Sequence, residues 1–346
     1  MMHKQNCEEY RGIWVVAEQT VDGISRVSFE LLAKARELKE QGGIQEPVTV
    51  VLLGEKLDEY TAKLAEAGAE AIILIDHPAL QYFQNETYAA IVKALVEQRK
   101  PSIILMGATA AGSDLAPTLG AKLCTGVSAH CVDMRLNEQG HLVAVVPAFG
   151  GKVLGDILCT EYRPQIATVR PGILGKVTCF LKKECPVESF DITDILAQDK
   201  GRVKAIGMMH EEMKGVPLEE AEIVVAGGFG IENKQIWHQL EELASILGGA
   251  VGCTRPPIDE GWVKECQMIG TSGKSVRPKV YIGVGISGAT HHICGMKDAG
   301  LVISINKDDK APIFDVSDIR ITADAAKLLP LLIEEMQKNR EEVICP

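Results

Sequence analysis

Apolar runs of strand length alternate with amphipathic stretches of helix length along the first third of this 346-residue chain. The predicted strands are IWVVAE (13–18), VTVVLLG (48–54), AIILID (71–76) and SIILMG (102–107). The predicted helices cover residues 28–41, 60–67, 88–98 and 115–123. Buried strands that alternate with helices form parallel sheets joined by crossover connections, so this pattern predicts an α/β domain.

The pattern changes after residue 125. Short strand candidates follow, broken by Gly and Pro: HLVAVVPAF (141–149), QIATVR (165–170) and VTCFLK (177–182). We predict that they extend the same sheet. The mixed, charged stretch 183–221 predicts a linker or hinge, with a domain boundary near residue 212.

The strand–helix pattern then begins again. Its predicted elements are the strands 222–228, 279–283 and 301–306 and the helices 235–249 and 325–338. The chain is therefore predicted to be α/β with two domains, residues 1–212 and 213–346. Each domain is expected to be a mainly parallel sheet flanked by helices.

Composition excludes several classes of protein. A net charge of −11 without a concentrated basic face argues against a nucleic-acid partner. No apolar stretch reaches the roughly 18 residues of a membrane span, so no membrane insertion is expected. The ten cysteines include no CxxC pair, which argues against a zinc or iron–sulfur site. Scattered thiols and a start without a signal peptide's apolar core predict a cytoplasmic protein.

The string KVYIGVGISGATHH places Gly283, Gly285 and Gly288 directly after a strand, at the start of a helix. Glycines there allow a tight turn and the close approach of a pyrophosphate to backbone N–H groups. The hydroxyl of Ser287 adds a donor. The alternative, an ordinary glycine-rich strand–helix turn, remains open from this string alone.

Other residues limit the kind of site. Asn306 ends the next strand, where a dinucleotide fold usually carries a ribose-binding acid, so a usual NAD site is disfavoured. The GKS at 273–275 is not a phosphate-binding P-loop, because Met268 occupies the position of the motif's first glycine. His291 and His292 point in different directions on a helix, and each could equally be a structural histidine. No nucleophile-and-base arrangement is found, which favours a cofactor holder over an acid–base enzyme.

The motifs (S/T)RPxxDxGW, GISGAxxHxxGM and INKDxxAPIF occur here in that order. With them, residues 10–338 resemble the α subunits of electron-transfer flavoproteins. The resemblance implies a Rossmann-like FAD-binding second domain and an electron carrier rather than an enzyme. The FAD contacts that it implies are Thr254, Arg255, Ile269, Gly270, Thr271, Ser272, Gly285, Ser287, Gly288, Ala289, Thr290, His291, His292, Asn306, Asp324 and Ala325.

The resemblance also implies roles for individual residues. Arg255 would lie against the isoalloxazine, His292 would bond the carbonyl at its pyrimidine end, and Ser272 would reach the N5 edge. The glycine turn would hold the pyrophosphate, while Asn306 and Asp324 would reach the adenosine end. Of these residues, Arg255, His292 and Ser272 would supply a cation and donors at the ring, where negative charge develops on reduction.

Two positions depart from the family pattern. Phe229 stands where the family usually has arginine, in the glycine turn after the first strand of the second domain. Arg320 stands where the family usually has glycine. We hypothesise that Arg320 partly replaces the missing cation.

The resemblance implies a heterodimer with a β subunit that carries AMP or a second FAD. Donors would be flavin dehydrogenases such as the acyl-CoA dehydrogenases of fatty acid oxidation, and the acceptor a quinone oxidoreductase or a similar protein. One alternative is an electron-bifurcating, NADH-dependent complex. An NAD-dependent oxidoreductase and a nucleotide-binding regulatory protein without a redox role are alternatives from other classes.

Overall fold

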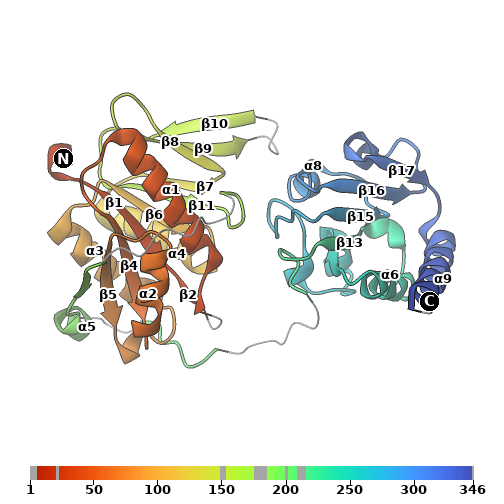
Figure 1. The fold of residues 1–346 in the computed structure, drawn as a ribbon, viewed down its shortest axis with the longest axis horizontal. Helices are drawn as coiled ribbons and strands as arrows, with labels where there is room; N and C mark the ends of the chain where they lie inside the picture. The colour runs from red at the N-terminus through yellow and green to blue at the C-terminus, as the bar shows by residue number, and fades with distance from the viewer. Residues whose placement is uncertain are drawn as a thin grey trace. The chain divides into compact units, whose positions relative to one another are not determined.

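The computed structural model describes residues 6–20, 23–148, 153–174, 185–198, 202–208 and 216–344, with side chains up to residue 338. The chain divides into two compact units, unit 1 (Met1–Met209) and unit 2 (His210–Pro346) (Figure 1). The predicted boundary at residue 212 falls close to this division. Across the described part of the chain, no helix is both long and apolar enough to cross a bilayer.

Unit 1 is built on a seven-stranded parallel sheet in the order β12-β5-β4-β1-β6-β11-β7. The strands are β1 (Ile13–Ala17), β4 (Val48–Gly54), β5 (Ala71–Asp76), β6 (Ile103–Gly107), β7 (Val127–Cys131), β11 (Gln165–Val169) and β12 (Val187–Ser189). The helices are α1 (Arg26–Gly42), α2 (Asp58–Glu66), α3 (Asn85–Arg99), α4 (Ala110–Leu123) and α5 (Thr193–Gln198). Short elements are η1 (Cys7–Glu9), η2 (Pro78–Leu80) and the hairpin of β2 (Gln19–Thr20) and β3 (Gly23–Ile24).

Each face of this sheet has its own apolar core. Residues of α1 and α2 pack on one face, and residues of α3 and α4 pack on the other. The central strands β1, β4 and β6 are buried along their whole length. Strands covered on both faces appear in the sequence as continuous apolar runs, and the four strands predicted from such runs are all present.

The prediction that residues 141–182 extend this sheet is only partly right. QIATV joins it as β11. Residues 142–148 instead form β9 (Leu142–Ala148), the middle strand of a separate antiparallel sheet with β8 (Asp133–Leu136) and β10 (Val153–Leu158). Apolar alternation does not specify which sheet a strand joins. The predicted strand VTCFLK lies outside the described residues.

The linker predicted over residues 183–221 is shorter in the structure, because residues at both of its ends pack into the two units. Val187 of β12 pairs with Ile72 of β5, and Ile192 is buried in the core to which α3 and α4 contribute. At the other end, Leu218 is buried in the core of unit 2. Apolar side chains spaced among the charges therefore anchor both ends of the segment, and any hinge role falls to residues between them.

Unit 2 is a Rossmann-like domain with a five-stranded parallel sheet in the order β14-β13-β15-β16-β17. The strands are β13 (Ile223–Gly227), β14 (Ala250–Cys253), β15 (Val280–Val284), β16 (Leu301–Asn306) and β17 (Ile319–Thr322). The helices are α6 (Lys234–Ile246), α7 (Arg255–Asp259), α8 (Thr290–Ile293) and α9 (Ala325–Ile344). The short turns are η4 (Phe229–Ile231), η5 (Glu265–Gln267) and η6 (Pro312–Val316). The prediction of an α/β chain with two mainly parallel sheets is confirmed.

Helix α6 shows how the sequence specifies this domain. The side chain of Asn233 caps it by accepting the N–H groups of Gln235 and Ile236, each at 3.0 Å. Its buried stripe of Trp237, Leu240, Leu243 and Ala244 packs with α9 on one face of the sheet. The other face is covered by α8, η6 and the loops around them. In chain order the connections from β13 and from β15 run in opposite directions across the sheet, so a crevice is expected where these two strands end.

Candidate functional site

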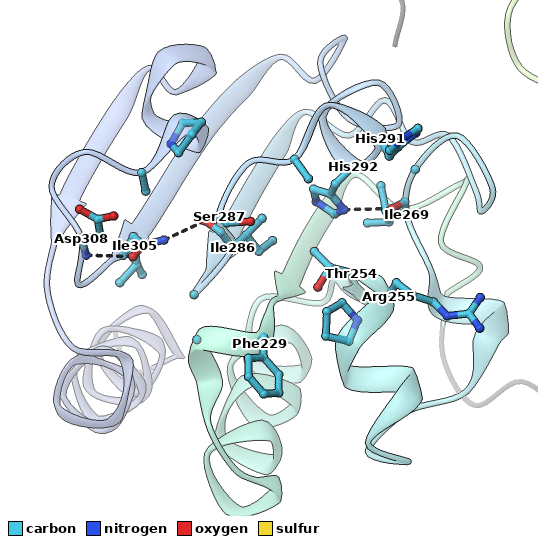
Figure 2. A pocket seen from close by; sticks show the side chains of 18 of the residues that line it. Phe229, Thr254, Arg255, Ile269, Ile286, Ser287, His291, His292, Ile305 and Asp308 are labelled. Atoms are coloured by element: carbon cyan, nitrogen blue, oxygen red, sulfur yellow. Dashed lines mark hydrogen bonds between the residues drawn. The ribbon is translucent and has the colours of Figure 1, made fainter. Parts of the chain in front are cut away.

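A cavity of about 640 Å³ lies at the carboxyl edge of the sheet in unit 2 (Figure 2). Each of the five strands contributes a residue at its end or just beyond it: Phe229, Thr254, Gly285, Asn306 and Asp324. Ligand crevices in open parallel sheets lie at this edge, where the direction of the connections reverses. The volume is typical of sites for small molecules and cofactors.

The cavity brings together most of the residues predicted from the sequence. Its lining includes Thr254, Arg255, Ile269, Gly270, Thr271, Ser272, Gly285, Ser287, Ala289, His291, His292, Asn306, Asp324 and Ala325. Gly288 and Thr290 do not line it. Whether the lining residues contact FAD remains a prediction.

The glycine turns explain why Gly288 still matters. Gly288 has a φ of +95°, and a Cβ there would lie 2.1 Å from the backbone nitrogen of Ile313. Gly285 has a φ of +62°, and a Cβ there would lie 2.7 Å from the carbonyl carbon of Gly230. The two turns are also joined by a 2.9 Å hydrogen bond from the Gly230 N–H to the Gly285 carbonyl. Glycine is thus required by backbone–backbone packing, a reason that the sequence interpretation did not include.

The turn also offers donors to an anion. Among the described residues, the backbone N–H groups of Ser287, Gly288 and Ala289 have no acceptor. Successive N–H groups in a turn with positive φ form a concave anion site. Helix α8, which the turn was predicted to open, is only four residues long, so these N–H groups, not a helix dipole, are the feature that suits a pyrophosphate.

His292 is buried, with 4% of its surface exposed, and both ring nitrogens are engaged. Nδ1 lies 2.9 Å from the carbonyl oxygen of Ile269, and Nε2 lies 2.7 Å from the Tyr281 hydroxyl. A carbonyl only accepts, so Nδ1 carries the proton and the hydroxyl donates to Nε2. Burial lowers the pKa of His292 to about 4, which makes the ring neutral at pH 7. A bond from His292 to a flavin carbonyl, as predicted, would require one of these two bonds to break.

His291, by contrast, is exposed at the cavity. Its Nδ1 lies 3.0 Å from the Thr271 hydroxyl, a contact that joins the α8 turn to the loop between η5 and β15. The backbone N–H of Thr271 also donates to the carbonyl of His291. The sequence left both histidines open between a site role and a structural role. The structure makes His292 the buried, bonded one and His291 the accessible one.

Two permanent cations line the cavity among the described residues, Arg255 and Lys307. Arg255 begins α7, and its Nε donates to Asp259 at 2.8 Å. Lys307 pairs with Glu232 of the glycine turn after β13, at 2.5 Å. Arg320 is not part of the lining and lies on exposed β17, so the hypothesis that it replaces the family's arginine has no support in the structure.

Sequence reasoning missed part of the lining. The additional residues are Phe229, Gly230, Pro256, Met268, Gly273, Ile286, Ile305, Lys307, Asp308, Ala311, Pro312 and Ala323. Phe229 had a signal, its place in the turn AGGFG, and it stacks on Trp262 with ring centroids 6.3 Å apart. Most of the others are immediate neighbours of predicted residues. Extending each motif by one residue would have found seven of these residues, but not Gly230, Asp308, Ala311 or Pro312.

Fold and site together define a nucleotide-cofactor domain fused to a second α/β domain. Residues 13–195 match the model of the electron transfer flavoprotein domain, and residues 217–297 match that of the electron transfer flavoprotein FAD-binding domain. The chain belongs to the electron-transfer flavoprotein α subunit family, and FAD is the cofactor of its second domain.

Curated relatives match over nearly the whole chain. An electron transfer flavoprotein subunit alpha from Thermoanaerobacterium thermosaccharolyticum is 39% identical, covering 95% of this chain and 99% of that protein. Protein FixB from Clostridium saccharobutylicum is also 39% identical, covering 96% and 98%. The lactate dehydrogenase (NAD(+),ferredoxin) subunit LctC from Acetobacterium woodii is 36% identical, covering 97% and 81%.

The residues present fit FAD. The unpaired N–H groups of residues 287–289 suit a pyrophosphate, and the apolar side chains of Ile269 and Ile286 beside polar Ser272 and Thr271 suit a planar ring with polar edges. No group of three or more His, Cys, Asp or Glu able to hold a metal occurs in the described ranges.

Proposed function

We propose that this chain is the FAD-carrying half of an αβ heterodimer that accepts electrons from flavin dehydrogenases and passes them to a quinone oxidoreductase or another acceptor. Unit 1 would contact the β subunit. The observation that carries the proposal is that one cavity collects fourteen of the sixteen residues that were predicted to contact FAD. A cytoplasmic location and acyl-CoA dehydrogenases of fatty acid oxidation as donors are parts of the same proposal.

Different residues of the chain would bind different parts of FAD. The N–H groups of residues 287–289 would hold the pyrophosphate, and Asp324 with Asn306 would hold the adenosine end. The Asn306 amide already donates to the Ile286 carbonyl at 2.8 Å and accepts from the Asp308 N–H at 2.9 Å, so its orientation is set before binding. FAD, when bound, supplies the capacity to accept and release electrons.

At the ring end, the donors would be Arg255, Thr271, Ser272 and His291, which all line the cavity. Cations and donors near the place where charge develops favour the reduced, more negative cofactor. His292 would act on FAD indirectly. Its Nδ1–H donates to the Ile269 carbonyl and so positions the loop that carries Thr271 and Ser272.

A second candidate function is electron bifurcation. The name of the LctC relative couples NAD(+) and ferredoxin, which favours an NADH-linked complex of this kind. The cofactor content of the β subunit separates the two candidates. AMP in the β subunit supports the simple carrier, whereas a second FAD reducible by NADH supports bifurcation.

The test is to co-express the chain with its β subunit and purify the complex. We expect a yellow heterodimer whose flavin is bleached by a reduced flavin dehydrogenase and reoxidised by an acceptor dye. Nucleotides extracted with acid then identify FAD, AMP or a second FAD. A colourless complex that cannot be reconstituted with FAD would contradict the proposal.

A further inference from the structure

Arg255 is held by acidic side chains at the edge of the cavity. It is the first residue of α7, a single turn stiffened by Pro256 and Pro257. Its Nε donates to Asp259 Oδ1 at 2.8 Å, and its Nη1 lies 3.7 Å from Glu265 Oε1. Figure 2 shows the side chain extending away from Ser287 and Phe229.

The spacing within α7 allows Asp259 to form a hydrogen bond with Arg255. Residues four apart lie on the same face of a helix, so Asp259 meets Arg255 from one turn along. Glu265 lies beyond the helix and is more exposed, at 74% of its side chain against 58% for Asp259. The hydrogen bond to Asp259 is the largest cause that raises the pKa of Arg255, and Glu265 contributes least. The two carboxylates therefore differ in how strongly they hold the same cation.

We propose that Asp259 is a positioning residue that sets where the Arg255 guanidinium lies and how much of its charge reaches FAD, and thereby sets the midpoint potential of the cofactor. The inference rests on the proposed placement of FAD in this cavity. A carboxylate bonded to the cation offsets its field, since opposite charges a few ångströms apart cancel at longer range. Releasing the cation favours reduced FAD.

The experiment is a reductive titration of the FAD-loaded αβ heterodimer against a reference dye. Asp259→Asn is expected to raise the midpoint potential. The affinity for reduced FAD relative to oxidised FAD should rise roughly threefold or more, which corresponds to the energy of about one exposed ion pair. Glu265→Gln removes the same charge from the same neighbourhood and is the matched control. We expect Glu265→Gln to shift the ratio of the affinities for reduced and oxidised FAD by less than half as much as Asp259→Asn does.

A double-mutant cycle tests whether the effect passes through the cation. In an Arg255→Gln background, Asp259→Asn should change the potential far less than it does in the wild type. Asp259→Glu keeps the charge and should stay close to the wild-type potential. Thermal melting and FAD content of each variant report whether its fold is intact.

Three results would overturn the inference: a potential that is unchanged or lowered in Asp259→Asn, an equal shift in the Arg255→Gln background, or a shift in Asp259→Glu as large as that in Asp259→Asn. With each of these results, the wild-type complex would still contain FAD and show its flavin spectrum. Failure of the proposed function would instead appear as a wild-type complex without bound FAD, so the two outcomes are distinguishable.

Discussion

At the residue scale, the buried His292 makes unit 2 sensitive to acid. Its pKa is lowered from 6.5 to about 4, chiefly by burial. The unfolded chain therefore binds a proton more readily than the folded chain between these values, so stability falls as pH drops from about 6.5 to 4. The full loss is about 3 kcal/mol. Urea unfolding followed by the fluorescence of Trp237, which is buried in unit 2, measures it.

His292→Gln should remove this component and flatten the stability profile across that pH range. His291→Gln is the matched control, because His291 is the exposed neighbour on the same helix. A profile for His292→Gln that is as steep as the wild-type one would contradict the assignment of the acid sensitivity to His292.

Phe229 makes a second residue-scale prediction. Phe229→Arg places a cation in the glycine turn, close to the predicted pyrophosphate. We expect the affinity for FAD to rise about two- to fivefold, and the gain to shrink with added salt. Quenching of flavin fluorescence on binding measures the affinity. Phe229→Gln, which also loses the stacking on Trp262 but adds no charge, should show no gain. An equal gain in both variants would rule out the charge as the cause.

At the element scale, the turn between β15 and α8 has no room for a side chain at Gly288. Gly288→Ala would place its Cβ against the backbone of Ile313, in addition to the strain of a positive φ. Gly248, after α6, also has a positive φ of +66°, but nothing lies within 4 Å of the position of its Cβ. We expect Gly248→Ala to cost about 1 kcal/mol from strain alone, and Gly288→Ala to cost clearly more.

Comparing the urea midpoints of the two alanine variants, together with their FAD content, checks this prediction. Equal costs would mean that the η6 segment moves aside easily. In that case the turn would not be fixed by packing.

Local periodicity predicted the central strands and helices because their burial follows from spacing within a few residues. It could not assign β9 to its own sheet, since pairing partners are distant in sequence. The site residues came from motif positions. That both nitrogens of His292 are engaged could not be foreseen, because Tyr281 and Ile269 reach it from a different strand and a different loop.

At the scale of the whole molecule, the two units have separate apolar cores. Leu52 is fully buried in unit 1 and Leu240 in unit 2. Leu52→Ala should destabilise only unit 1, and Leu240→Ala only unit 2, each by about 2–5 kcal/mol. The two variants are matched controls for each other, and a shift of both transitions in either variant would contradict independent cores.

Two transitions in a calorimetric scan provide the measurement. The fluorescence of Trp14, in a core of unit 1, and of Trp237, in a core of unit 2, assigns each transition to its unit. Added FAD should raise only the transition of unit 2, because a ligand stabilises the state that binds it.

Every residue that lines the cavity lies between Phe229 and Ala325. This lining predicts that the binding of FAD and assembly with other proteins are separable events. We therefore expect unit 2 to bind FAD before any subunit joins, and to keep the same FAD contacts when the surroundings of the domain change.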